Sequence, residues 1–527
     1  MKIGVILDGW KLARWQAEAL ETVAGEAEFT VYSCTTPAPA TRRLRHAFYY
    51  ALNLVTVRNR MSRRVALPGA IRIVRTHEFA APSEGRWQSL PPGLLDTIAG
   101  DRPVVLVKFG MGLLRVPPAE RLAVPILSFH HGDPAKFRGR PAGFHELVQG
   151  QPTVGQVVQI LSNQLDSGRI AAAAETRALA YSYRATLVEA FRHSPLLLAP
   201  AIRAAVAGAA RRPAQSGPAY RLPGNWAVAR FVLARVRAAL ARFLYGLTRE
   251  KRWSVATAPA PDRLTVGELT DRLTDESSWA AVPTPPGSRF LADPFFHPGG
   301  GLLVEAMGAG SARGAIVHLG PEPRRLSGRG GHFSYPAVVD RWLVPETSDW
   351  SPTMAFPLGE AGLGEPVELT IPGRPRLLDP TPFQNRDGLF LFGNIASEGP
   401  SVLRLWVADS LDGQFAEHPA SPIRISPNGA RMAGLPILMA DGLVRVGQDL
   451  RRGYGDGITF FRVTRLDRQH YEEEEIGTFR FANRRGPHTL NLSRGGEMAF
   501  DHYAESFSLL AGLRRWKERR AARRIGD

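Results

Sequence analysis

The heptapeptide FLADPFF (Phe290–Phe296) sets an acid and a proline among apolar residues, and three related heptapeptides follow it. They are FSYPAVV (Phe333–Val339), LLDPTPF (Leu377–Phe383) and MAGLPIL (Met432–Leu438). Their prolines, at positions 294, 336, 380 and 436, are 42, 44 and 56 residues apart. A second strand-like run follows each heptapeptide, at 301–307, 341–348, 388–394 and 442–449. Repeats of roughly 40–50 residues with several strands each are typical of β-propellers.

A fifth, less regular unit can be built from PHTLNLS (487–493) and EMAFDHY (497–503). Residues 253–510 therefore predict an all-β five-bladed propeller, and a double-sheet sandwich is the alternative.

The residues just before the repeated prolines are expected to point into the central channel, with Gly434 in that place in the fourth repeat. Two further acids stand on the second strands, in the apolar settings LLVEAM and LVPETS. Such acids either accept structural hydrogen bonds or bind sugars, and hydrolysis would need an acid and a base at a defined separation. Five residues are expected to bind the substrate: Asp293, Glu305, Tyr335, Glu346 and Asp379.

Residues 1–177 alternate short apolar runs with helical patterns, which predicts a parallel, Rossmann-like α/β sheet. One strand candidate, VPILSFH (Val124–His130), ends on polar residues. Since ligands bind at the carboxyl ends of such strands, Ser128, His130 and His131 are site candidates. No G-x-G-x-x-G motif follows the first strand, which argues against a dinucleotide.

Residues 178–252 predict a basic helical linker, and residues 511–527 form a strongly basic tail. One helix within 225–252 carries an apolar stripe, with Arg235 and Arg242 pointing the other way and Arg230 and Arg237 flanking it. The stripe is made of Trp226, Ala229, Leu233, Val236, Leu240, Phe243 and Leu247. Two interpretations remain open: the stripe packs on a neighbouring domain, or the helix makes peripheral contact with an anionic membrane. The tail is either solvated or in contact with anionic lipid or nucleic acid.

The composition narrows the function further. The formal net charge is +17 in an arginine- and alanine-rich chain, but no nucleic-acid module is visible, so no specific nucleic-acid partner is expected. The single cysteine, Cys34, excludes a cysteine-rich zinc site, and no metal is predicted. A cytoplasmic, possibly membrane-peripheral location is expected, because neither a signal peptide nor a long apolar span is visible.

Residues 108–168 resemble the folate-dependent formyltransferase family, which includes methionyl-tRNA and sugar-nucleotide N-formyltransferases. The family's N-x-H motif corresponds to SFH (Ser128–His130), and its loop ending in Tyr-Arg-Gly corresponds to KFRG (Lys136–Gly139). Its T-x-G and L-D-x-G segments correspond to PTVGQVVQIL (152–161) and QLDSG (164–168). Upstream, KFGMGLL (108–114) is similar to the strand and loop beside the pterin.

The resemblance implies transfer of a formyl group from 10-formyltetrahydrofolate to an amine, with His130 as the base and Asp166 as its partner. The attacking amine must lose a proton, which a histidine can accept near neutral pH. The family's asparagine stabilises the oxyanion, and Ser128 stands in its place, while His131 replaces a proline and is expected to contact the substrate. Five residues are expected to bind the folate: Phe109, Gly110, Lys136, Arg138 and Gly139.

Residues 253–510 are similar to the propeller domain of plant glucosamine inositolphosphorylceramide transferases. They are also broadly similar to five-bladed glycoside hydrolase and glycan-binding propellers. The motifs that carry this are FLADPFF, VEAM, SYPAVV, VPETS, LLDPTPF and VGQDLRRGYGDGI. The hydrolase pattern has an aspartate on the second blade, where this chain has Tyr335, and this departure favours carbohydrate recognition over hydrolysis.

Two functions therefore remain open. In the first, the chain formylates an amino sugar or glycolipid that the propeller holds. In the second, the formyltransferase fold is catalytically degenerate, and the protein binds or processes glycans in surface polysaccharide or glycolipid biosynthesis. A methionyl-tRNA acceptor is disfavoured, because no small β-barrel follows the first domain.

Overall fold

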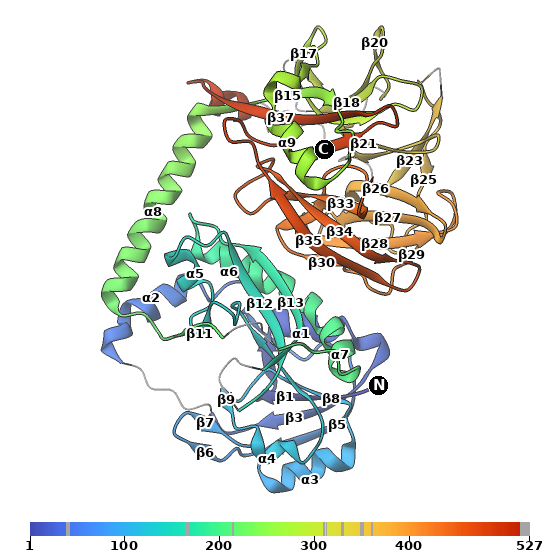
Figure 1. Cartoon of the computed structure of the whole chain (residues 1–527). Coiled ribbons are helices and arrows are strands. Elements are labelled where there is room, and N and C mark those ends of the chain that lie inside the picture. The colour runs from blue at the N-terminus through green and yellow to red at the C-terminus, as the bar shows by residue number, and fades with distance from the viewer. Residues whose placement is uncertain are drawn as a thin grey trace. The chain divides into compact units, whose positions relative to one another are not determined.

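The computed structural model describes residues 1–37, 43–163, 168–212, 216–308, 311, 313–327, 331–347, 352–359 and 362–516. The chain divides into two compact units, Met1–Arg242 and Phe243–Asp527 (Figure 1). The division falls inside the segment 178–252 that the sequence set apart as a linker. Asp166, the expected partner of His130, lies outside the described residues.

A seven-stranded sheet forms the centre of the first unit, in the order β13-β12-β10-β8-β1-β3-β5. Its strands are β1 (Lys2–Asp8), β3 (Glu28–Cys34), β5 (Arg72–Phe79), β8 (Val105–Lys108), β10 (Ile126–His130), β12 (Thr153–Ile160) and β13 (Arg169–Arg177). The first five of these strands are parallel, as predicted. The expectation of a wholly parallel sheet is wrong at β12, which pairs antiparallel with β10 on one side and with β13 on the other. Only eight residues join β12 to β13, too few for the crossover that a parallel pair requires.

Helices cover the sheet of the first unit. They are α1 (Arg14–Glu21), α2 (Ala47–Val55), α3 (Pro92–Asp101), α4 (Pro117–Glu120), α5 (Phe144–Val148), α6 (Tyr183–His193) and α7 (Leu198–Val206). The apolar residues of α3 and α4 share a core with strand residues such as Ile6, Leu106 and Ile126. Helices α6 and α7 contact β13, so these two helices of the expected linker segment pack on the sheet.

The long helix α8 (Asn225–Thr248) is amphipathic, but it does not dock through the predicted stripe. Val228 and Phe231, on the opposite face, are buried against Phe144 and Tyr183, and the stripe residue Leu233 is 58% exposed. The face with the arginines is thus the docking face, and Arg235 lies over the Phe231 ring with 4.9 Å to its centroid. Among the described residues, no helix combines the length and hydropathy needed to cross a membrane.

Five antiparallel sheets follow one another in the described part of the second unit. The first sheet consists of β17 (Ser288–Phe296), β18 (Leu302–Gly308), β19 (Gly314–Leu319) and β20 (Pro323–Arg325). The second consists of β21 (Phe333–Val339), β22 (Trp342–Thr347), β23 (Met354–Gly359), β24 (Gly362–Leu363) and β25 (Val367–Glu368). The third consists of β26 (Leu377–Asn385), β27 (Gly388–Ile395), β28 (Val402–Ala408), β29 (Ala416–Glu417) and β30 (Arg424–Ile425). The fourth consists of β31 (Asn428–Met432), β32 (Ile437–Met439), β33 (Gly442–Asp449), β34 (Ile458–Leu466) and β35 (Tyr471–Phe479).

The fifth sheet joins the two ends of the unit. Strand β15 (Arg249–Pro259) pairs along its whole length with β37 (Glu497–Phe507), and β16 (Ala280–Ala281) and β36 (Leu490–Leu492) flank this pair. The predicted fifth repeat supplied β36 and β37, while β15 and β16 were missed because they precede the first repeat. A helix, α9 (Val266–Thr274), lies between β15 and β16 in the chain.

A bulge with left-handed backbone recurs in the first strand of four sheets. Asp293, Tyr335 and Asp379 have φ of 49°, 49° and 43°, and the strand register shifts at each of them. In the fourth sheet the shift lies at Gly429, with φ of 77°, so Gly429 takes the place expected for Gly434. Glycine enters this conformation freely, but it costs energy at a bulky residue such as Tyr335.

The burial of α8 allows a stability test. We expect Phe231→Ala to destabilise the first unit by about 3–5 kcal/mol, because it removes a buried ring that stacks on Phe144 at 4.2 Å. The matched variant Phe243→Ala, at a 61% exposed position of the same helix, should change stability by less than about 0.5 kcal/mol. Urea unfolding of the full chain measures both, and equal effects would contradict the assigned docking face.

Candidate functional site

A row of polar side chains crosses the first unit's sheet near the carboxyl ends of two parallel strands. Ser128 on β10 lies level with Lys108 on β8 and with Gln159 on β12. Residues level with one another in neighbouring strands point to the same side, and so do residues two apart in one strand. His130 therefore shares this face with Ser128 and Gln159. The pairing with β12 brings in Gln159, which the sequence analysis did not select.

The ring of His130 is held by the loop that follows it. Its Nε2 lies 3.1 Å from the carbonyl oxygen of Phe137. Because a carbonyl can only accept, Nε2 carries the proton in this contact. Gly132 permits this arrangement: a Cβ there would lie 2.7 Å from the Phe137 oxygen and 2.9 Å from His130 Nε2. The geometry thus fixes the imidazole of His130 at the end of β10.

The loop after β8 packs on Phe129, which alternates with Ser128 and His130 along β10 and therefore points to the other face of the sheet. The Phe109 ring stacks on that of Phe129 at 5.7 Å, and Trp15 meets it edge-on at 5.9 Å. Gly110 approaches β1 so closely that a Cβ would lie 2.5 Å from the backbone nitrogen of Asp8. The close approach explains why a glycine stands there.

The KFRG loop contributes cations and a tight turn. Arg138 Nε donates to the carbonyl of Gly217 at 2.6 Å, and the Lys136 side chain is 59% exposed, 3.7 Å from Asp133. Gly139 has φ of 88°, and a Cβ there would lie 2.2 Å from the Tyr220 carbonyl. Through the bond from His130 to Phe137, this loop joins the same strand end as Ser128.

His131 has a different setting from His130. Its Nε2 lies 2.8 Å from Ser194 Oγ, which donates to Gln156 Oε1 at 2.9 Å. Trp15 and Phe191 meet its ring edge-on at 5.3 Å and 4.8 Å. Burial, with a smaller contribution from His130, lowers the pKa of His131 to about 3. These contacts favour a neutral, structural His131 over the substrate contact expected from the sequence.

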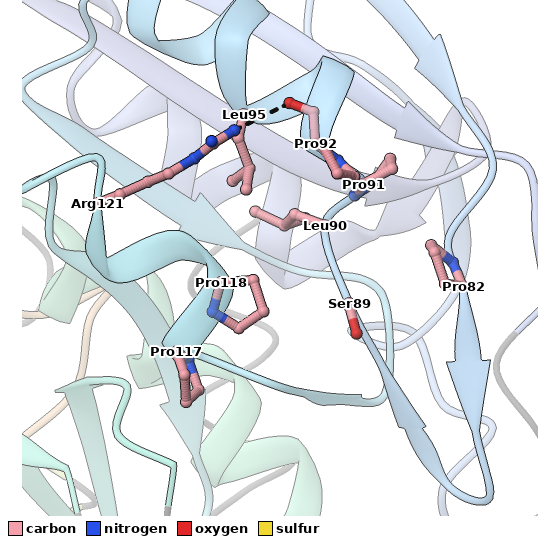
Figure 2. Close-up of a pocket in the computed structure, with 9 residues that line it drawn as sticks. All are labelled: Pro82, Ser89, Leu90, Pro91, Pro92, Leu95, Pro117, Pro118 and Arg121. Carbon is pink, nitrogen blue, oxygen red and sulfur yellow. Dashed lines mark hydrogen bonds between the residues drawn. The ribbon is translucent and has the colours of Figure 1, made fainter.

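A surface pocket of about 520 Å³ lies elsewhere in the first unit (Figure 2). Prolines dominate its wall, and Arg121 closes one side by donating to the Pro92 carbonyl at 3.1 Å. It is lined by Pro82, Ser89, Leu90, Pro91, Pro92, Leu95, Pro117, Pro118 and Arg121. None of the predicted site residues lines it, and it offers no group suited to proton transfer.

In the second unit, the structure brings the predicted acids together around the first strands of the sheets. Asp293 Oδ2 accepts from the amide of Tyr335 at 3.1 Å, and Asp293 Oδ1 accepts from Thr489 Oγ1 at 2.7 Å. His488 lies between two carboxylates, with Nδ1 2.7 Å from Asp501 and Nε2 3.3 Å from Asp293. Burial lowers the pKa of His488, but Asp501 and Asp293 outweigh it, so the net shift is upward.

The ligand atoms of Asp293, His488 and Asp501 lie within 4.8 Å of one another, close enough to hold a metal ion. Each ring nitrogen of His488 already faces a carboxylate, however, which suits a protonated imidazole and leaves no lone pair for a metal. The geometry therefore favours an ion triad at this position.

A second ion cluster joins the second, third and fourth sheets. Arg431 bonds Asp379 through Nε at 2.5 Å and Glu346 through Nη2 at 3.0 Å. Gln448 Nε2 also donates to Asp379 at 2.7 Å. Burial raises the pKa of Asp379 to about 6, against the lowering effect of Arg431. With this arginine and amide bound to it, Asp379 is poorly placed to be a free catalytic acid.

Glu305 and Tyr335 differ in what they offer a ligand. Glu305 Oε1 lies 3.9 Å from Nε2 of His332, and burial together with four surrounding carboxylates holds the pKa of Glu305 well above its usual range. Tyr335 is fully buried, and its hydroxyl accepts from Gly434 and bonds Thr381. The geometry thus favours a structural Tyr335 and leaves Glu305 able to bind a ligand.

Sequence reasoning missed His488, Asp501, Arg431 and Gln448. His488 and Asp501 stand in the fifth repeat, PHTLNLS and EMAFDHY, and Gln448 stands in the second strand of the fourth. All four stand in or beside the repeated segments, so aligning all five repeats was the signal available.

Comparison with known proteins supports the resemblance of the second unit. Residues 331–506 match the family "Glucosamine inositolphosphorylceramide transferase 1, N-terminal". The chain is 26% identical over 225 residues to glucosamine inositolphosphorylceramide transferase 1 of Arabidopsis thaliana and 27% identical over 220 residues to that of Oryza sativa subsp. japonica. These matches cover 39% and 37% of this chain and 29% of each relative, so the chain corresponds to less than a third of the relatives' length.

Two solved structures illustrate the weaker likeness to formyltransferases. Phosphoribosylglycinamide formyltransferase of Coxiella burnetii is 16% identical, with a TM-score of 0.28, over 42% of this chain and 99% of that chain. The N-formyltransferase of Helicobacter canadensis, in complex with folinic acid and dTDP-3-aminofucose, is 9% identical, with a TM-score of 0.27, over 42% of this chain and 70% of that chain.

The ion triad predicts a pH dependence of the second unit. A raised folded-state pKa means that His488 contributes stability below its unfolded value of about 6.5, and that this is lost as the pH rises through the folded value. We expect His488→Gln to remove this loss and to destabilise the unit by about 3–5 kcal/mol at pH 6, because two carboxylates lose their cation.

Urea unfolding at several pH values, with hydrogen exchange in β36 and β37 to identify the transition, measures this effect. The matched variant His470→Gln, at a half-exposed histidine of the same unit, should leave the profile unchanged. An unchanged profile in His488→Gln would contradict the ion triad.

Proposed function

We propose that the first unit transfers a formyl group from 10-formyltetrahydrofolate to an amine, and that the second unit holds the carbohydrate part of the acceptor. The observation that carries this proposal is the position of His130. It stands at the end of a parallel strand, with its Nε2 bonded to Phe137 and with Ser128 and Gln159 on its own face. This combination provides a base and hydrogen-bond donors at one strand end.

In the proposed step, the amine nitrogen attacks the formyl carbon, and its proton passes to the imidazole of His130. The carbonyl oxygen becomes an oxyanion, which needs preorganised donors. The Ser128 hydroxyl and the Gln159 carboxamide are the donors we propose; Gln159 Oε1 already accepts from the Gly168 amide at 3.3 Å. The bond from the formyl carbon to N10 of the folate then breaks, N10 takes up a proton, and a formamide and tetrahydrofolate leave. Asp166 stays the predicted partner of His130.

The residues present fit a folate co-substrate. Phe109 and Gly110 follow β8 directly, next to the end of β10, and Gly110 keeps the strand end free of a side chain. The exposed ammonium of Lys136 and the guanidinium of Arg138 can attract the carboxylates of a folate tail. Phe109, Gly110, Lys136, Arg138 and Gly139 thus stay the proposed binding residues.

For the second unit, we propose that the five sheets are the blades of a propeller and that its acids bind an amino sugar or glycolipid. Carboxylates accept hydrogen bonds from sugar hydroxyls, and a cluster of acids attracts an ammonium group. The side chains of Glu305, Glu346 and Arg431 keep 11–14% exposure, so they are the ones a ligand can reach. The relatives' name, a glucosamine inositolphosphorylceramide transferase, supports a glycolipid acceptor. A cytoplasmic location stays a prediction.

Formylation of a panel of amino sugars and amino-sugar lipids, with 10-formyltetrahydrofolate as donor, tests the proposal. We expect transfer by the wild type and a loss of about 10²- to 10⁴-fold in His130→Gln, because the general base is removed. Gln159→Leu should lower kcat by about 10²- to 10³-fold if its amide stabilises the oxyanion. His145→Gln, a histidine of the same unit on α5, is the matched control and should retain activity.

Undiminished transfer in His130→Gln would contradict its role as base. Absence of any transfer by well-folded wild type would contradict the enzyme and leave the second candidate, a degenerate formyltransferase fold in a glycan-binding or glycosyl-processing protein. The acid cluster around Glu305 specifically favours that candidate, and glycan binding by the wild type, lost in Glu305→Gln, would identify it.

A further inference from the structure

Helix α8 has two apolar faces, and only one of them packs on the protein. Val228 and Phe231 are buried in the first unit. The other face carries the stripe of seven residues spaced alternately three and four apart, from Trp226 to Leu247. Its six large members are 40–75% exposed, which is unusual for a continuous apolar row of six turns. Among the described residues, neither unit taken by itself covers the stripe.

A second exposed apolar patch adjoins the last turn of this helix within the second unit. The amide of Ser508 donates to the carbonyl of Thr248 at 2.8 Å, and a helical turn over 511–516 follows. The exposed apolar side chains there are Phe507, Leu509, Leu510, Leu513 and Trp516. The patch continues the stripe residues Phe243 and Leu247 at the end of α8.

Positive charge is concentrated on the same two segments. Residues 225–252 carry a formal net charge of +6 and residues 511–527 carry +5, which together is +11 of the chain's +17 in 45 of its 527 residues. Within α8 itself there are four arginines and no acid. By helical geometry, Arg230 and Arg237 lie along one edge of the stripe. The apolar stripe and these two arginines therefore share one surface of the helix.

We propose that the stripe of α8, with the adjoining patch of the second unit, binds the surface of an anionic membrane. An interfacial helix buries its apolar face at the boundary between headgroups and acyl chains, while arginines at its edge reach anionic headgroups. A second copy of the helix is a poor partner, because Arg230 and Arg237 at the edge of its stripe would meet the same two arginines with no acid of the helix between them. Nucleic acid would leave the large apolar side chains in water. This inference does not depend on formyl transfer.

Co-sedimentation of the full chain with vesicles tests the proposal. We expect binding to phosphatidylcholine vesicles that contain about one third phosphatidylglycerol, weakening as salt rises, and at least about tenfold weaker binding to pure phosphatidylcholine. A stripe variant, Leu233→Gln, Leu240→Gln and Phe243→Gln together, should bind at least about tenfold less tightly, because it removes the inserting side chains. An edge variant, Arg230→Gln with Arg237→Gln, should lose roughly fivefold per arginine.

The control variant changes one exposed apolar residue in each unit, Val104→Gln and Leu438→Gln, and should bind as the wild type does. Circular dichroism of each variant checks folding, which substitutions at exposed positions should not disturb. The proposal is overturned if the wild type ignores anionic vesicles, if it binds neutral vesicles as tightly, or if the stripe variant binds like the wild type. Binding of single-stranded RNA without binding of vesicles would also overturn it. So would a wild-type protein that binds no vesicles but forms a dimer, with the dimer lost in the stripe variant.

Discussion

In the second unit, carboxylates bond the backbone of the next sheet. Asp501 of the fifth sheet accepts from the amide of Asp293, which opens the first sheet's bulge, at 3.0 Å. Asp293 in turn accepts from the amide of Tyr335, and Glu346 of the second sheet accepts from the amide of Asp379 at 3.1 Å. Buried amides and carboxylates must be paired, and here each pairing joins two neighbouring sheets. This chain of bonds links four of the five sheets.

That constraint shapes what the acids can do. A carboxylate that holds the next sheet is costly to protonate or move, which sets Asp293 and Asp379 apart from the acids of a hydrolase. Among the described residues, no backbone amide of the next sheet is seen to donate to Glu305, and burial raises the pKa of this carboxyl. The bonds of Asp293 and Asp379 support the proposal that this unit holds a ligand.

Much of the fold could be predicted from local patterns. The heptapeptides around Pro294, Pro336 and Pro380 marked three of the bulges, because proline there fixes the strand that follows. The fourth bulge, at Gly429, was missed because its strand has no proline at that point. The docking face of α8 could not be predicted, since a helix with two apolar faces does not itself reveal which one meets the protein. The candidate site residues were harder to predict than the fold. Gln159 and His488 reach their positions through pairing of strands that are distant in the sequence, and the spacing of neighbouring residues does not indicate such pairing.

The proposed chemistry depends on the strand end where Ser128, His130 and Gln159 share one face. A crystal structure of the full chain with bound 5-formyltetrahydrofolate would test this assignment. We predict a pterin beside Phe109 and Gly110, with the formyl oxygen toward Ser128 and Gln159 and the formyl carbon facing the amine site next to His130. Folate bound instead in the proline-lined pocket of the first unit, or in the second unit, would contradict the assignment.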